Sequence, residues 1–241
     1  MAAQRVIQPK PWKENAYLAA RRLRGPRGAA FAAPPTGALF WGYRRHRRPT
    51  PLTMKTMTSA ETSPSLTLRA AKIKLLLMDV DGVLTDGRLF YAPGPNGEMV
   101  ESKAFDAQDG ISLQWANWMG IETGVISGRD SPALVARARQ CRIKYIYQGH
   151  IEKIPIYEKI LAEAGAAEEQ VGYIGDDLTD APILARVGFS AAPANARPEV
   201  KKMVHLVTAA AGGRGAVREV IEVVLRAQDK WQHILEKYGV G

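Results

Sequence analysis

The residues best suited to chemistry begin at Asp79, in the segment "DVDGVLTDG" that closes an apolar run. Asp79 and Asp81 are two positions apart, so their Cβ atoms lie on the same side of an extended chain. A carboxylate is a weak nucleophile in water, but it can attack phosphorus once a metal ion has neutralised the phosphate. A second carboxyl group can protonate the leaving oxygen and then activate water. This spacing therefore suits phosphoryl transfer in which Asp79 attacks and Asp81 serves as acid and base.

Further polar groups occur at the ends of later apolar runs. Ser127 lies in "VISGR", Lys153 in "YQGHIEKIPIY", and Asp176 and Asp177 lie in "GDDLTD". A single Asp after a strand is more often a helix cap, and "SGR" or "GDD" alone is a weak signal. Three strand ends that all carry phosphate-compatible groups make capping a poor explanation for the whole set.

The elements that must position these groups alternate between strand and helix from Ala71 onward. Strands that alternate with helices of ~10–15 residues predict parallel βαβ units and an α/β fold with a doubly wound sheet. In such sheets ligands bind beyond the carboxyl ends of the strands. The dipeptide Asn96-Gly97 predicts a β-hairpin. We expect strands at 72–80, 122–127, 144–148, 171–176, 188–193 and 205–208, and helices at 110–120, 131–140, 154–165, 180–187, 196–204 and 216–228.

The basic charge of the 241-residue chain belongs to its N-terminal segment. Residues 1–68 hold 12 of the 33 basic and 2 of the 24 acidic residues, which leaves 21 basic and 22 acidic residues in 69–241. We expect 1–68 to be a basic, disordered extension, a consequence of a wrong start, or a targeting segment, and 69–241 to be the folded domain. A nucleic-acid-binding role would rest on the extension alone.

The single cysteine and the hydropathy restrict the location. Cys141 can form no disulfide within the chain, so we expect a reducing compartment, the cytoplasm. Cys141 precedes a core strand, which favours packing over a role as nucleophile. No apolar run approaches the ~18 residues that span a membrane, so no membrane partner is expected.

The order of these motifs resembles the haloacid dehalogenase superfamily, whose signature Asp-x-Asp-Gly follows the first strand of a Rossmann-like fold. The resemblance implies Asp79 as nucleophile, and Ser127 with Gly128 as binding groups for the phosphoryl oxygens. It implies Lys153 as the cation beside phosphate and nucleophile. The implied ligands of a Mg²⁺ cofactor are Asp79, Asp176 and the backbone carbonyl of Asp81, with Asp177 further out.

The intervals between the motifs leave no room for a cap domain. A capless site must act on a macromolecule or use a wall from a neighbouring subunit. The segments "KAFDAQDG", "YQGHIEK" and "GGRGAVREV" resemble the 3-deoxy-D-manno-octulosonate 8-phosphate phosphatase family, from about Lys72 to Ala227. This resemblance implies a capless homotetramer with a β-hairpin flap, acting on a small phosphorylated sugar acid for lipopolysaccharide synthesis.

Two arginines are candidates for binding the anionic substrate, because a guanidinium fork suits planar oxyanions. Arg214 lies in a Gly-rich turn, where the backbone can approach a ligand; for Arg129 a surface salt bridge is an equal alternative. Lys103 and Asp109 are weaker candidates.

The sequence departs from the family at four positions, and other functions stay open. Gln108 stands where a basic residue is common, and Ile151 stands where a polar residue is usual. Ser112 replaces a frequent Gly, and Ser127 replaces the commoner Thr. The alternatives are a phosphatase for a nine-carbon sugar acid phosphate and a non-catalytic tetramerisation module.

Overall fold

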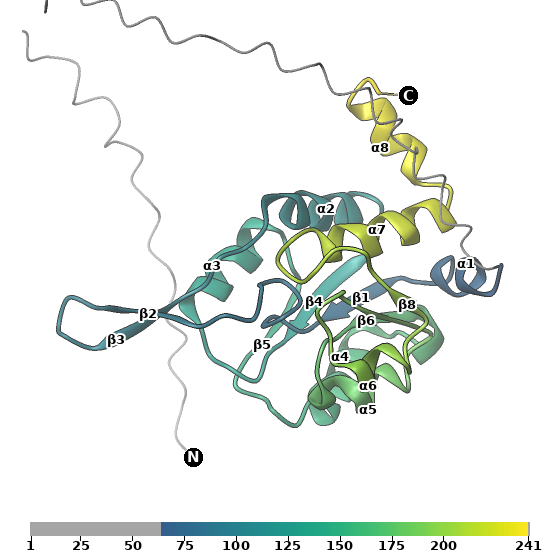
Figure 1. Cartoon of the computed structure of the whole chain (residues 1–241). Helices are drawn as coiled ribbons and strands as arrows, with labels where there is room; N and C mark the ends of the chain where they lie inside the picture. Colours follow the sequence, from purple (N-terminus) through teal and green to yellow (C-terminus); the bar gives the residue numbers. More distant parts are fainter. Residues whose placement is uncertain (1–63, 241) are drawn as a thin grey trace, which may run out of the picture. The chain divides into compact units, whose positions relative to one another are not determined.

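The computed structural model describes residues 64–240, which form a six-stranded parallel sheet covered by helices (Figure 1). The strand order is β5-β4-β1-β6-β7-β8. The chain runs from β1 to one edge of the sheet and then crosses to the other side, so the topological switch point lies at the end of β1. The strands are β1 (Leu75–Met78), β4 (Glu122–Ile126), β5 (Tyr145–Tyr147), β6 (Val171–Ile174), β7 (Phe189–Ala192) and β8 (Leu206–Val207).

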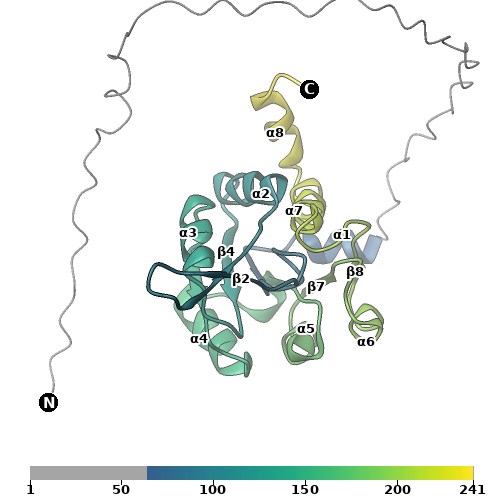
Figure 2. The same ribbon diagram turned by 60° about the vertical axis from the view of Figure 1, so that its left-hand side comes forward.

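Helices cover both faces of this sheet (Figure 2). The alternation of side chains along β1 shows why: Leu76 and Met78 pack into one buried cluster, and Leu75 and Leu77 pack into the other. Both faces of the strand are therefore apolar, as expected for a buried parallel strand. The helices are α1 (Pro64–Ala70), α2 (Ala107–Trp118), α3 (Pro132–Gln140), α4 (Ile154–Ala164), α5 (Ala181–Leu184), α6 (Pro198–Lys201), α7 (Ala216–Ala227) and α8 (Trp231–Lys237), with 3-10 turns η2 (Glu168–Gln170) and η3 (Leu178–Asp180).

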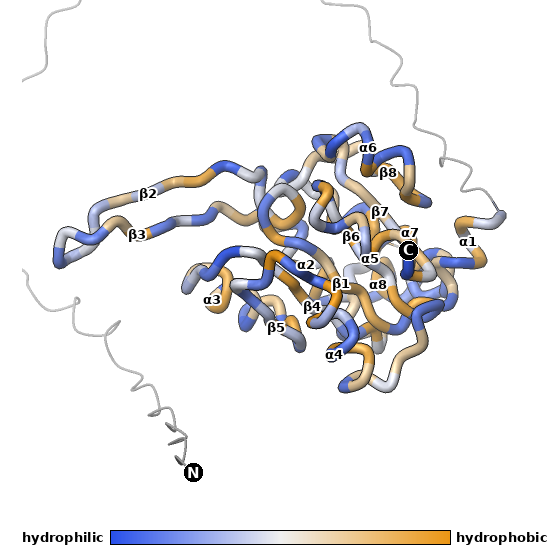
Figure 3. Tube along the Cα trace, turned by 90° about the horizontal axis from the view of Figure 1, so that it is seen from below, coloured by the Kyte–Doolittle hydropathy of each residue, from blue (hydrophilic) through white to orange (hydrophobic). Residues whose placement is uncertain are grey.

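The predicted hairpin is present as β2 (Phe90–Pro93) and β3 (Met99–Ser102), which pair antiparallel. Its two strands extend away from the body of the domain (Figure 3). Between β1 and β4 the described chain holds this hairpin and α2, and no further domain. The predicted doubly wound fold with a hairpin flap and no cap is confirmed.

Two helices were not expected from the sequence. Helix α1 begins at Pro64, so residues 64–68 are helical although they belong to the predicted extension; the rest of that extension lies outside the described residues. Helix α8 follows α7, and its Ile234 is buried in the same cluster as the α7 side chains. In the part of the chain that the structure describes, every helix is too short or too polar to cross a membrane.

Cys141 packs in the core, as predicted. The residue is 1% exposed and lies among the apolar side chains of one face of the sheet. Burial raises the pKa of its thiol, which keeps it protonated and unreactive. The interpretation of Cys141 as a buried apolar residue is therefore confirmed.

Asp109 has a structural role that the sequence did not indicate. Its side chain is buried in α2 and accepts hydrogen bonds from the backbone N–H of Arg218 (2.8 Å) and of Gly215 (3.3 Å), at the start of α7. The N-cap residue of α7 is Gly215 itself, which has no side chain to cap the helix. Burial raises the pKa of Asp109 to about 6, against the effect of these N–H donors. Asp109 thus joins α2 to α7.

Replacing Asp109 by Ala should lower the free energy of unfolding by about 1–3 kcal/mol, because buried N–H groups lose their acceptor. The melting temperature should fall by about 2–4 °C for each kcal/mol. Asp109→Asn is the matched control, since it keeps one acceptor oxygen and should lose less. Calorimetry measures both variants; equal melting temperatures for Asp109→Ala and the wild type would contradict the capping role.

Candidate active site

Three strands end side by side at the switch point, and the residues that follow them line one pocket. Asp79 follows β1, the segment 127–129 follows β4, and Asp176 lies just after β6. The register pairs Met78 with both Val125 and Ile174, so the three strand ends are level. A pocket of about 170 Å³ opens there, lined by Asp79, Asp81, Gly128, Arg129, Ile151, Lys153, Asp176, Asp177 and Thr179.

Lys153 is a buried cation in contact with Asp79. Its Nζ lies 2.7 Å from Asp79 Oδ1, and the two side chains are 3% and 12% exposed. The same Nζ lies 2.6 Å from Asp180 Oδ1. Burial by itself would lower the pKa of Lys153, but the charges of Asp79 and Asp180 outweigh it and the pKa is raised. Lys153 is therefore positively charged, and it is held against the predicted nucleophile as the sequence suggested.

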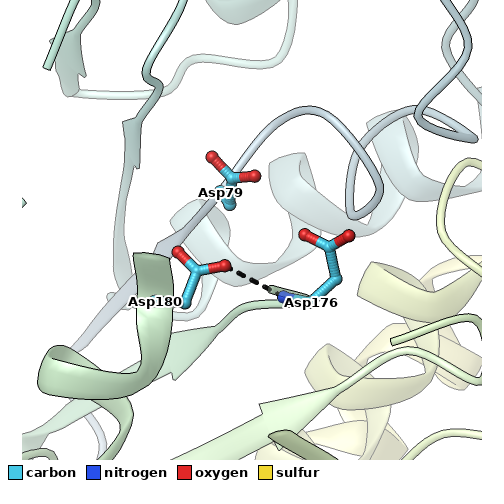
Figure 4. A group of neighbouring side chains, drawn as sticks. All are labelled: Asp79, Asp176 and Asp180. Atoms are coloured by element: carbon cyan, nitrogen blue, oxygen red, sulfur yellow. Dashed lines mark hydrogen bonds between the residues drawn. The ribbon is translucent and has the colours of Figure 1, made fainter. Parts of the chain in front are cut away.

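The carboxylates of Asp79, Asp176 and Asp180 form an acidic cluster, with oxygens within 4.8 Å of one another (Figure 4). Asp180 is fully occupied by protein donors. Its Oδ1 accepts from Lys153 and from the hydroxyl of Tyr173 at 2.8 Å, and its Oδ2 accepts from the backbone N–H of Asp176 (3.0 Å) and Asp177 (3.3 Å). Asp180 therefore organises the loop, and it leaves Asp79 and Asp176 as the pair that faces the pocket.

Asp176 has the properties of a cation ligand. Its Oδ1 is buried without a hydrogen-bond partner among the described residues. Burial raises the pKa of Asp176 to about 7, and the charges of Asp79 and Asp180 add to this effect. Burial also raises the pKa of Asp79 to about 6, although Lys153 opposes the shift. An orphaned buried oxygen beside a second carboxylate suits a hard divalent cation, so the residues fit the predicted Mg²⁺.

Gly82 allows the loop after β1 to approach the loop after β6, which carries Asp176. A Cβ atom at Gly82 would lie 2.1 Å from Asp176 Oδ2, and the residue has a φ of +100°. Either property excludes a side chain there without rearrangement. The carbonyl oxygen of Gly82 also accepts a 3.0 Å hydrogen bond from Asn195. Position 82 therefore favours glycine because a side chain there would collide with Asp176, which lies far along the chain.

Asp81 lines the pocket but is not free of protein contacts. Its side chain is partly exposed, and Oδ1 contacts the Nζ of Lys103. Lys103 is 1% exposed at its side chain and also lies 3.0 Å from Glu101 Oε1. The structure thus places Lys103 behind Asp81, between two carboxylates, and outside the residues that line the pocket.

Arg129 combines a place in the pocket wall with a salt bridge. Its Nη2 and Nε contact Glu101 Oε2, the latter at 3.1 Å, and Nη2 donates a 2.8 Å hydrogen bond to the hydroxyl of Tyr91. Tyr91 and Glu101 are paired across the hairpin. Burial would raise the pKa of Glu101, but hydrogen bonds from Arg129 and Lys103 lower it. The hairpin is therefore attached to the pocket rim through charged groups.

Ser127 and Arg214, two predicted substrate-binding residues, are not among the residues that line the pocket in the described chain. The Ser127 hydroxyl donates to the carbonyl of Arg129 at 3.0 Å and accepts from its N–H at 3.1 Å, so it shapes the turn in which Gly128 lines the pocket. Arg214 is exposed and is not among the residues that line the pocket in the described chain. Its turn contacts the loop after Asp81, because Gly213 N–H donates to Val83 O at 2.9 Å.

The sequence did not single out Asp180, Tyr173 or Glu101. Asp180 had a usable signal, since it lies in the same "GDDLTD" segment as Asp176. For Tyr173 the only signal was its place in the strand that ends at this motif. Glu101 lies 28 residues from Arg129, and no local pattern links the two residues.

Comparisons with known proteins give one consistent result. Residues 134–221 match the haloacid dehalogenase-like hydrolase family. A 3-deoxy-D-manno-octulosonate 8-phosphate phosphatase of Yersinia pestis is 45% identical over 162 residues, which are 67% of this chain and 84% of the relative. The crystal structure of the Yersinia pestis phosphatase gives a TM-score of 0.66 at 43% identity and covers 70% of this chain and 89% of that chain.

A second solved structure shows a member with its ligands. The phosphatase of the same name from Moraxella catarrhalis, in complex with a magnesium ion, a phosphate ion and a KDO molecule, is 35% identical with a TM-score of 0.68. The match covers 72% of this chain and 97% of that chain. The predicted resemblance is thus confirmed.

Stabilisation by Mg²⁺ should increase with pH. The folded-state pKa values of Asp79 and Asp176, about 6 and about 7, lie above the ordinary value of 3.8. Their contribution to the stability of the metal-free protein is therefore fully present below about pH 4 and is lost as pH rises through 6 and 7. A cation binds the ionised forms, so the rise in melting temperature with Mg²⁺ should be small at pH 5 and large at pH 8.

Asp176→Asn is the control for this experiment, because it removes one of the two ionised ligands with little change in size. The variant should lose most of the Mg²⁺-dependent rise at pH 8. Thermal unfolding with and without Mg²⁺ measures both quantities; a rise that is independent of pH in the wild type would contradict the assignment.

Proposed function

This chain belongs to the 3-deoxy-D-manno-octulosonate 8-phosphate phosphatase family, and we propose from this premise that Asp79, Asp81 and Lys153 carry out the hydrolysis. The protein is a Mg²⁺-dependent phosphomonoester hydrolase that releases phosphate from 3-deoxy-D-manno-octulosonate 8-phosphate in the synthesis of lipopolysaccharide precursors. The observation that carries the proposal is the buried contact of 2.7 Å between Lys153 Nζ and Asp79 Oδ1, at the carboxyl end of β1. A charged lysine beside a buried carboxylate orients it and opposes the rise in pKa that burial causes.

The first step is attack of an Asp79 carboxylate oxygen on phosphorus. An acyl-phosphate bond forms, the ester P–O bond breaks, and Asp81 donates a proton to the leaving sugar oxygen. Asp79, Asp176 and the backbone carbonyl of Asp81 would hold Mg²⁺, which neutralises charge on the phosphate when bound. Lys153 offsets the remaining negative charge at Asp79.

The second step returns Asp79 to its free form. Asp81, now ionised, takes a proton from a water molecule, and that water attacks phosphorus and breaks the bond to Asp79. Inorganic phosphate leaves. Lys103 holds Asp81 on the pocket wall through both steps, and its buried position between Asp81 and Glu101 suits this role and not a contact with the sugar acid.

Substrate binding combines groups at the rim. The backbone at Ser127 and Gly128 receives the phosphoryl oxygens, and Arg129 offers a cation that is 42% exposed at the pocket wall. Arg214 is assigned to the same anionic substrate through the Gly-rich turn beside the loop of Asp81. The small substrate is expected to meet the chain in the cytoplasm, where the free thiol of Cys141 stays reduced.

A panel of phosphate esters tests the substrate. With Mg²⁺ present, kcat/KM should be highest for 3-deoxy-D-manno-octulosonate 8-phosphate, lower for a nine-carbon 3-deoxy sugar acid phosphate, and lowest for hexose phosphates and nucleotides. A preference for the nine-carbon compound would contradict the substrate while keeping the chemistry. No hydrolysis of any ester would support a non-catalytic module.

Asp79→Asn should abolish turnover with the fold intact, because an amide cannot form the acyl phosphate. Asp81→Asn should accumulate the phosphoenzyme, since no group remains to activate water. Acid-quenched incorporation of labelled phosphate measures the intermediate. Asp177→Asn is a matched control outside the proton-transfer pair and should keep more activity than either variant; turnover by Asp79→Asn at the wild-type rate would exclude the mechanism.

We further propose that the hairpin binds a second copy of this chain, within a homotetramer. Phe90 and Met99 on the hairpin are 50% and 61% exposed, and Leu89, Tyr91 and Val100 are also exposed. The register places Phe90 with Val100 on one face of the hairpin and Tyr91 with Met99 on the other, so both faces carry exposed apolar surface. Such a surface is unfavourable in water and is typical of an interface. A pocket without a cap also needs a cover to exclude water from the substrate.

Phe90→Glu and Met99→Glu should dissociate the assembly and lower kcat/KM together, because charge on both apolar side chains opposes their burial. In the separate subunit these exposed changes should alter stability by about 0.5 kcal/mol or less. Light scattering and kinetics measure the two effects. Shortening the turn at 93–97 is the control and should be mild; a fully active monomer of the wild type would contradict the shared site.

A further inference from the structure

Tyr173 lies in the core directly behind the pocket and takes part in its charge network. The side chain is 0% exposed on β6, and its hydroxyl donates a 2.8 Å hydrogen bond to Asp180 Oδ1. The same oxygen accepts from Lys153 Nζ at 2.6 Å, and Lys153 Nζ also donates to the Tyr173 hydroxyl at 3.4 Å and to Asp79 Oδ1 at 2.7 Å. A continuous chain of contacts therefore joins a buried hydroxyl to the proposed nucleophile.

We propose that Tyr173 is a positioning residue, whose hydroxyl fixes the Asp180 carboxylate so that Lys153 stays on Asp79. This inference rests on the proposed function, in which Asp79 attacks phosphorus. Tyr173 is not among the residues that line the pocket, so it acts through Asp180 and Lys153 and has no contact with a ligand.

The two oxygens of Asp180 explain the need for the hydroxyl. Oδ2 accepts from the backbone N–H groups of Asp176 and Asp177, which anchors the metal-binding loop. Oδ1 is left with Lys153 and Tyr173 as its two donors. Without the hydroxyl, Lys153 would be the only donor to Oδ1, and it could move toward Asp180 and away from Asp79.

The hydroxyl of Tyr173 is a dependable donor. Burial raises its pKa well above the ordinary value of 10, and the charge of Asp180 raises it further. The proton therefore stays on the phenol oxygen at any working pH. Asp180 in turn keeps an acceptor role, since a phenol and an ammonium both donate to it.

Tyr157 provides a matched control in the same protein. It is also 0% exposed and lies in the same buried cluster as Tyr173. Its hydroxyl has no hydrogen-bond partner within residues 64–240. Tyr157→Phe and Tyr173→Phe therefore remove the same atom from the same core, but only the second removes a donor to Asp180.

The experiment compares wild type, Tyr173→Phe and Tyr157→Phe by kinetics with two phosphate esters, the eight-carbon sugar acid phosphate and p-nitrophenyl phosphate. Tyr173→Phe should lower kcat about 10-fold, because a hydrogen bond to a charged group is lost, and change KM by about two-fold or less. Tyr157→Phe should leave both parameters unchanged. Equal kcat values for the two variants would overturn the proposal.

A binding measurement separates this inference from the proposed substrate. Beryllium fluoride with Mg²⁺ mimics a phosphoryl group on a carboxylate, so it should raise the melting temperature of the wild type and of Tyr157→Phe. Tyr173→Phe should show a smaller rise, whichever ester the enzyme hydrolyses. An undiminished rise would overturn the role of Tyr173, whereas failure to hydrolyse any ester would contradict only the proposed function.

A double-mutant cycle tests the route through Lys153. In a Lys153→Met background, Tyr173→Phe should cause no further loss in the beryllium fluoride response, because the group that it positions is already absent. If the double variant lost as much of the beryllium fluoride response as Tyr173→Phe and Lys153→Met lose together, the route through Lys153 would be overturned.

Discussion

The buried ammonium group of Lys153 is the constraint on which the site depends. Asp79, Asp176 and Asp180 place three carboxylates within a few ångströms at the end of a hydrophobic sheet, and their mutual repulsion would be large in such a place. Lys153 offsets part of that charge through direct contacts with two of them. Breaking a buried ion pair by removing one partner typically costs about 3–5 kcal/mol. Burial raises the pKa values of Asp79 and Asp176, and the remaining negative charge of the cluster adds to this effect. That remaining charge is the physical basis for cation binding.

The apolar sheet makes this arrangement possible. Leu75, Leu76, Leu77 and Met78 bury both faces of β1 and hold the strand at the centre of the sheet. The two neighbouring strands end at the same level, so polar groups from three distant segments share one small volume. A site on rigid strand ends keeps its geometry without support from the ligand. The absence of a side chain at Gly82 then leaves room for the carboxylate of Asp176, which lines the pocket.

The rim is organised differently, by charged groups on less constrained segments. Glu101 accepts from Arg129 and lies beside Lys103, so the hairpin carries both a link to the pocket wall and a link to Asp81. The apolar side chains of the same hairpin point into solvent in the single chain. The hairpin therefore links Asp81, the acid and base of the proposed reaction, to the surface that packs against the hairpin in the proposed assembly.

The sequence by itself determined the doubly wound sheet, the hairpin and the polar residues that follow the strand ends, because these depend on short-range patterns. Apolar runs that end in Asp79, Ser127 and Asp176, with helices between them, require parallel strands whose carboxyl ends meet. Cys141 was recognisable as a core residue for the same reason. The tertiary structure alone decided the partners of each charge: Asp109 caps α7 across the fold, Lys103 lies behind Asp81, Arg214 lies outside the pocket wall, and Tyr173 supports Asp180. Asp109 and Lys103 contact partners that are 109 and 22 residues away along the chain, so no local pattern links these pairs, and only the folded chain brings them within hydrogen-bond distance.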